Sequence, residues 1–131
     1  VNIAERVPPR MNYRDLLVKM KLDEMTAIVQ KIVKGSIDSF INNDPENALE
    51  IIKMDSVVDN MDIEIFQMLV DEMKQNNDYI EPCSHAITLL RNIERLADHA
   101  VNIAEDVFFL TDAKIVKHKK EFHRTQDEGN F

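Results

Sequence analysis

Glycine and proline are scarce in this sequence, and their scarcity limits the fold. The 131 residues contain two glycines and four prolines. A many-stranded β fold needs turn residues at intervals of about 8 to 12 positions, and this chain has too few of them. The sequence therefore predicts an all-α fold built from long helices.

A single cysteine and the lack of long apolar runs exclude other classes. Cys83 alone can form neither an internal disulfide nor a CxxC metal knuckle, which fits a reducing compartment. No stretch approaches the roughly 20 uncharged apolar residues that span a bilayer, and no basic segment followed by an apolar one resembles a leader. We expect a soluble, cytoplasmic protein that reaches a membrane only through its partners.

Basic residues are outnumbered, and the motifs of several enzyme classes are missing. Sixteen Lys and Arg against 24 Asp and Glu give a net charge of −8. This balance opposes non-specific nucleic-acid binding and favours cations or basic protein surfaces as partners. The sequence contains no glycine-rich phosphate loop, no HExxH motif and no serine–histidine–acid order, so we expect no catalytic residues.

One short segment occurs twice. Residues 1–7 read VNIAERV and residues 101–107 read VNIAEDV, which match at six of seven positions. Asparagine is an indifferent helix former, so helix propensity alone would not repeat it. We predict that residues 1–10 are the tail of a truncated upstream repeat plus a linker, that residues 11–111 form a three-helix bundle and that residues 112–131 form a basic C-terminal tail.

The apolar pattern and two polar breaks divide the chain into three helices. The first helix is predicted from Asn12 to residues 42–43, interrupted only by Gly35. Asp44 and Pro45 have the residue types of a helix start, and the second helix is expected to run to about Lys74. The third helix follows the break at residues 75–78 and continues through Leu110. Short connections predict an up-down-up bundle. The first apolar face contains Leu22, Met25, Val29, Ile32, Val33 and Phe40.

The second helix has carboxylates within its apolar stripe. At 100° per residue, Asp55 and Asp62 fall inside the stripe and Asp59 falls at its edge. An ionised carboxylate removed from water costs several kcal/mol unless it is paired or bound to metal. This face is therefore either a solvated rim or a place where acids meet cations. The apolar members of the stripe are Ile51, Val58, Ile65, Phe66 and Leu69.

The third helix carries a second acid pair. Glu94 and Asp98 are four residues apart, as are Asp55 and Asp59. Such pairs can bind hard cations through oxygen, but spacing alone favours a solvated network in which Arg91 and Arg95 neutralise the acids. The apolar face is predicted to contain Ile93, Leu96, Ala97, Ala100, Ala104 and Val107. The opposite, polar face is predicted to contain Arg91, Glu94, Arg95, Asp98, Asn102 and Glu105.

The remaining reactive side chains have structural interpretations. His99 follows Asp98 directly and is either a metal ligand or a histidine at the edge of the bundle, and His85 lies near the start of the same helix. A lone histidine is more often structural than ligating. Cys83 has no activating base nearby in sequence and is interpreted as a small buried hydrophobe.

A family resemblance rests on the third helix. Residues 81–85 read EPCSH and residues 91–107 read RNIERLADHAVNIAEDV, which resembles the third-helix signature of the PhoU family of phosphate-uptake regulators. The resemblance implies tandem three-helix bundles, of which this chain holds the second. Similar sequences commonly have glycine after this helix where this chain has Asp112, so the helix is free to continue into the tail.

The resemblance also implies a site and a role. Family members carry an acid-x-x-x-acid motif on two helices of each repeat, matched here by Asp55 with Asp59 and by Glu94 with Asp98. In some members these motifs hold multinuclear iron or zinc clusters and in others magnesium or manganese, so the resemblance implies a surface that can bind metal but not which metal. The implied role is regulatory, between the ATPase-driven phosphate ABC transporter and a sensor histidine kinase, whose starvation signalling is repressed when phosphate is plentiful.

Two other functions stay open from the sequence. Two acid pairs could also serve a carboxylate-bridged metalloenzyme, although di-iron bundle enzymes use Glu-x-x-His and Ala97 follows Glu94 at that spacing. The other alternative is a metal-free helical scaffold. Assembly as a homodimer also stays open. For the partner surface we predict Arg91, Arg95, Asn102 and Glu105, on the polar face of the third helix.

Overall fold

The computed structural model describes residues 12–129, with side chains described as far as Thr111. Within this part of the chain every regular element is helical, as the all-α prediction requires. The predicted upstream tail, residues 1–10, lies outside the described residues. The elements are α2 (Tyr13–Lys19), α3 (Leu22–Asn42), α4 (Pro45–Gln75), the 3₁₀ turn η1 (Asn77–Tyr79) and α5 (Ile80–Gly129).

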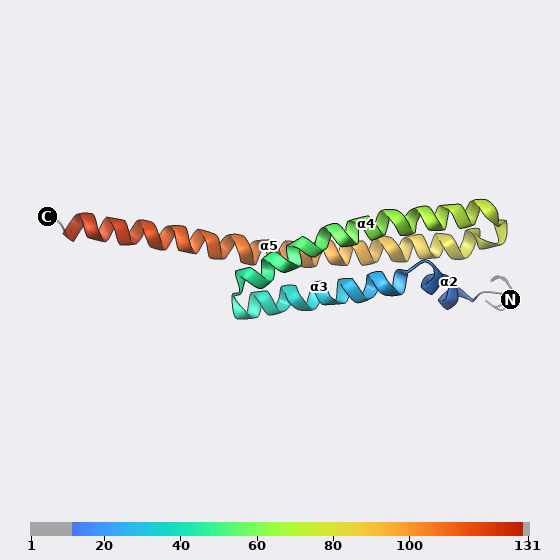
Figure 1. Ribbon diagram of the computed structural model, residues 1–131, viewed down its shortest axis with the longest axis horizontal. Coiled ribbons are helices and arrows are strands. Elements are labelled where there is room, and N and C mark those ends of the chain that lie inside the picture. The colour runs from blue at the N-terminus through green and yellow to red at the C-terminus, as the bar shows by residue number, and fades with distance from the viewer. Residues whose placement is uncertain (1–11, 130–131) are drawn as a thin grey trace.

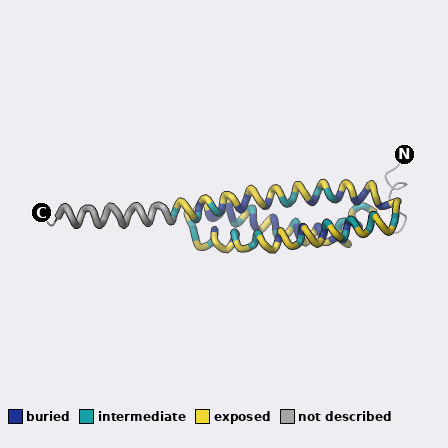
Figure 2. The backbone as a smooth tube through the Cα atoms, turned by 90° about the horizontal axis from the view of Figure 1, so that it is seen from above, coloured by how far each residue is buried: buried dark blue, intermediate teal, exposed yellow. Residues whose placement is uncertain are grey.

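Three long helices form the body of the molecule. Helices α3, α4 and α5 lie side by side, and α4 runs antiparallel to the other two (Figures 1 and 2). The up-down-up prediction is confirmed. Helix α5 was expected through Leu110 and continues to Gly129, so that it extends beyond the ends of α3 and α4 (Figure 1). Among the described helices, none combines the length and apolarity needed to cross a membrane.

The first predicted helix is in fact two helices. The chain breaks after Met20, where Lys21 adopts a left-handed conformation with φ of 63°. The break lets the short α2 turn back and bury Leu16 and Met20, which are 1% and 2% exposed. Lysine is not a residue that signals a left-handed turn, so the sequence pattern alone gave no reason to divide the helix.

The connection between α3 and α4 follows the predicted capping chemistry. The Asp44 side chain accepts a hydrogen bond from the backbone N–H of Asn47 at 3.1 Å. The Asn47 side-chain amide donates to the Gly35 carbonyl at 3.1 Å and to the Ser39 hydroxyl at 2.8 Å. Gly35 lies inside α3 without interrupting it. A Cβ at this position would stand 2.8 Å from Cγ1 of Ile51, so glycine permits the close approach of α3 and α4.

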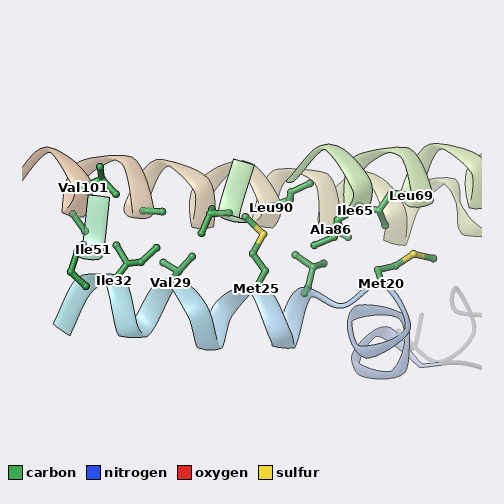
Figure 3. Packing of buried hydrophobic residues seen from close by; sticks show 14 of the residues in the cluster. Met20, Met25, Val29, Ile32, Ile51, Ile65, Leu69, Ala86, Leu90 and Val101 are labelled. Atoms are coloured by element: carbon green, nitrogen blue, oxygen red, sulfur yellow. The ribbon is translucent and has the colours of Figure 1, made fainter. Parts of the chain in front are cut away.

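The core lies between the three long helices (Figure 3). The predicted stripe of the first helix is buried at Leu22, Met25, Val29 and Ile32, but Phe40 was placed there wrongly and is 67% exposed. On α5 the alanines at 97, 100 and 104 are buried, which allows close helix packing.

Leu96 was also placed in the core wrongly. It is 52% exposed and lines a shallow groove between α3 and α5 together with Val33 and Ile37. The apolar face of α5 is wider than the part that packs in the core, and Leu96 lies at the edge of that face, next to the groove.

Candidate metal centre

Three aspartates from two helices meet on one side of the bundle. Asp55 and Asp59 lie one turn apart on α4, and Asp98 lies on the neighbouring α5. Each offers a carboxylate oxygen, and these oxygens all lie within 4.8 Å of one another. We call these three residues the aspartate cluster. Asp59 and Asp98 are exposed, whereas Asp55 is partly buried.

The cluster is electrostatically unbalanced at Asp55. Burial, followed by the charges of Asp59, Asp98 and Glu105, raises the pKa of the Asp55 carboxyl above its ordinary value. Among the side chains described, Oδ1 of Asp55 is buried and has no hydrogen-bond partner. A buried acceptor without a partner costs about 1–3 kcal/mol, and more when it is charged. A cation among these oxygens would relieve both the repulsion and the unmet acceptor.

A second acidic group lies beside the cluster and has its own cation. Arg91 on α5 donates to Oδ2 of Asp62 at 3.1 Å and to Oε2 of Glu94 at 3.3 Å. Its guanidinium carbon lies 5.0 Å from the centre of the Phe66 ring, a cation–π contact. Asp62 is only 7% exposed. We call Arg91, Asp62 and Glu94 the Arg91 site.

The four predicted metal ligands are split between the aspartate cluster and the Arg91 site. Asp55, Asp59 and Asp98 come together, whereas Glu94 is turned toward Arg91. Burial raises the pKa of the Glu94 carboxyl, as do the neighbouring Asp62 and Asp98, while the hydrogen bond from Arg91 lowers it. The sequence allowed two interpretations of the acids in the apolar stripe of α4: a solvated rim, or a contact with cations. Asp62 fits the second, because it is paired with Arg91.

The prediction that the polar face of α5 points away from the bundle is wrong in part. Glu94 and Glu105 are partly buried, because positions that flank the apolar stripe of a helix lie at the edge of its interface with the next helix. The charge of Glu105 contributes to the raised pKa of Asp55, and the sequence prediction did not group Glu105 with the metal-binding acids. Its spacing of seven residues from Asp98 was the available signal. Arg95 and Asn102 are exposed.

The donor set of the cluster is all oxygen. Carboxylate oxygens suit hard cations such as Mg²⁺, Mn²⁺ and iron, whereas structural zinc sites use cysteine and histidine. His99 is exposed and is not a member of the cluster, and His85 lies 4.0 Å from Glu81 on the first turn of α5. The residues present therefore fit a hard cation better than zinc.

Cys83 is fully buried, as the structural interpretation required. Burial and the charge of Glu72 raise the pKa of its thiol, which leaves little thiolate at neutral pH. We expect a thiol reagent such as dithionitrobenzoate to react with the native protein at least tenfold more slowly than with protein in urea. Equal rates, followed by absorbance, would show that this end of the bundle is open.

Comparison with known proteins places the chain in a family. The family model described as PhoU domain matches residues 22–107, from the first residue of α3 to a buried valine of α5. The matched range includes the aspartate cluster and the Arg91 site. No solved structure matches the chain significantly.

Several curated relatives are named phosphate-specific transport system accessory protein PhoU homolog. The one from Zymomonas mobilis is 34% identical over 113 residues, which cover 86% of this chain and 48% of the relative. The one from Pseudomonas aeruginosa is 36% identical over 90 residues, or 69% of this chain and 37% of the relative. Homolog 1 from Thermotoga maritima is 29% identical over 84% of this chain and 46% of the relative. This chain spans about half the length of such relatives or less, and it belongs to the PhoU family.

Proposed function

We propose that this chain is part of a regulator of phosphate transport and that it binds a hard divalent or ferric cation at the aspartate cluster. Family membership supports the regulatory part, since the relatives are named as accessory proteins of phosphate-specific transport systems. One observation carries the metal part. The partly buried Asp55 has an unpaired oxygen and two further carboxylates within 4.8 Å.

The proposed activity is binding rather than catalysis. The bound cation would supply positive charge that fixes α4 and α5 together through Asp55, Asp59 and Asp98. The metalloenzyme alternative has less support than an adaptor whose shape or surface charge depends on the cation, because the relatives are named as accessory proteins of a transport system.

The proposed partners are the ATPase of the phosphate transporter and a sensor histidine kinase, met in the cytoplasm. Of the residues predicted for the partner surface, Arg95 and Asn102 are exposed on α5 next to the acidic region. Arg91 is exposed as well, but its guanidinium is paired with Asp62 and Glu94. We therefore place the partner contact around Arg95, where a charge can influence encounter rate and partner choice.

A charge reversal in the full-length protein tests this role. Arg95→Glu is expected to switch on phosphate-starvation genes in phosphate-rich medium at least severalfold, with unfolding free energy changed by no more than about 0.5 kcal/mol. A reporter for those genes and a thermal melt give the two readouts. Lys31→Glu, a reversal of an exposed charge on α3, is the matched control and is expected to repress normally.

Two outcomes would count against the proposal. If Arg95→Glu represses like the wild type, the partner does not contact this face. If deletion of the whole gene leaves repression normal, the regulatory role itself is wrong.

A further inference from the structure

A basic segment lies in the part of α5 that extends beyond the body of the bundle. Residues 114–124 contain five lysines and arginines against one acid, Glu121, whereas the whole chain carries a net charge of −8. The segment is helical, because α5 continues to Gly129. Most of its bases recur at spacings of three and four residues, which places them on one face of the helix. They are Lys114, Lys117, Lys120 and Arg124.

An apolar row on α5 continues past the helices that cover it. Val101 and Phe108, seven residues apart, lie in the core or pack against it. The same spacing continues at Ile115 and Phe122. Figure 1 shows α5 running beyond the ends of α3 and α4, so within the described residues no other helix lies beside this part of the row. A helix that combines apolar positions with many bases is typical of segments that lie on membrane surfaces.

Exposed apolar side chains lie near the point where α5 leaves the bundle. The Thr111 hydroxyl is 3.2 Å from Oδ1 of Asn43, so the end of α3 lies beside α5 at this level. Within three residues before these two positions are four large apolar side chains that are 59–70% exposed. They are Phe40, Ile41, Phe109 and Leu110. Scattered exposed apolar residues are normal, but several at one end of a molecule indicate a binding surface.

We propose that this end of the molecule, the basic segment 114–124 together with the four exposed apolar side chains, binds directly to an anionic lipid surface. The bases would contact lipid phosphates, and the apolar side chains would enter the boundary between headgroups and acyl chains. A nucleic acid would neutralise the bases but offers no apolar layer. The inference goes beyond the proposed function, and it differs from the expectation that the protein reaches a membrane only through its partners.

Binding to vesicles tests the role of the charge. The protein is sedimented with vesicles of phosphatidylcholine, with or without an equal share of phosphatidylglycerol, and we expect it to bind only the anionic ones. Lys117→Gln combined with Lys120→Gln is expected to weaken this binding roughly tenfold or more, since each base near an anionic surface contributes about fivefold. The matched control is Lys31→Gln combined with Lys34→Gln, two exposed bases at the same spacing on α3, and is expected to bind like the wild type.

A pair of isoleucine variants tests the role of the apolar side chains. Ile41 and Ile63 are 70% and 68% exposed, but Ile63 lies in the middle of α4, away from this end. Ile41→Ser is expected to weaken binding to anionic vesicles severalfold, and Ile63→Ser is expected to leave it unchanged. Thermal melts of all these variants are expected to match the wild type, because the substituted residues are exposed or lie in the part of α5 beyond the bundle.

Several results would overturn the inference. They are no sedimentation with anionic vesicles, equal binding to neutral vesicles, or a Lys117→Gln, Lys120→Gln protein that binds like its control. Equal binding by Ile41→Ser and Ile63→Ser would also contradict it, since charge alone would then explain the binding. Binding to duplex DNA as tight as to anionic vesicles, and lost with the same lysines, would contradict lipid as the partner. None of these results bears on the aspartate cluster, whose Mn²⁺ binding is measured separately.

Discussion

Leu90→Ala is expected to lower the free energy of unfolding by about 2–5 kcal/mol, the usual cost of truncating a buried leucine. Leu90 is completely buried between the three helices (Figure 3). Leu96→Ala, on the same helix, is expected to cost less than about 1 kcal/mol, because Leu96 is 52% exposed. Urea denaturation of the two variants measures the difference directly.

This pair of leucines reports the rotation of α5 about its axis. The rotation that buries Leu90 and exposes Leu96 is the one that brings Asp98 toward Asp55 and Arg91 toward Asp62. Equal losses from the two variants, or a larger loss from Leu96→Ala, would mean that α5 is turned differently and that the acids of the two helices do not meet.

Asp55→Asn is expected to stabilise the metal-free protein and to abolish its stabilisation by Mn²⁺. Relief of the i,i+4 repulsion with Asp59 contributes about 0.2–0.5 kcal/mol, and relief of repulsion with Asp98 adds to this. A cation that binds only the folded state at one hundred times its dissociation constant stabilises the wild type by about 2.7 kcal/mol. Thermal melts in chelator and in Mn²⁺ separate the two effects.

The direction of the pH effect follows from the same carboxyl. Its pKa is raised in the folded state, so over the range between the unfolded and folded pKa values the folded state binds more protons. The contribution of Asp55 to the stability of the metal-free protein therefore falls as pH rises through this range.

Asp106→Asn, at an exposed position of α5, is the control for Asp55→Asn and is expected to change neither the melt in chelator nor the melt in Mn²⁺. An Asp55→Asn variant that responds to Mn²⁺ like the wild type would remove Asp55 from the site.

Local signals in the sequence were enough to predict much of the fold. Asp44 and Pro45 marked the start of α4, and the spacing of Ile51, Val58 and Ile65 identified its buried face. The break at Lys21 could not be predicted, because its left-handed conformation is imposed by the packing of Leu16 and Met20 and not by a glycine or asparagine.

The candidate site could be predicted only in part. Spacing within one helix identified the pairs Asp55 with Asp59 and Glu94 with Asp98. It could not show that Asp62 meets Arg91, since that contact depends on the register and rotation of α4 against α5. Those are set by the connection through η1 and by the small buried side chains of Ala97, Ala100 and Ala104, which are tertiary features.

The most direct test of the account is the position of a bound ion. Crystals of the protein grown with Mn²⁺ would be measured at the manganese absorption edge, where anomalous scattering marks the metal. We expect a strong anomalous peak within about 2.0–2.5 Å of carboxylate oxygens of Asp55, Asp59 and Asp98. Crystals with no peak at the aspartate cluster at saturating Mn²⁺ would contradict it.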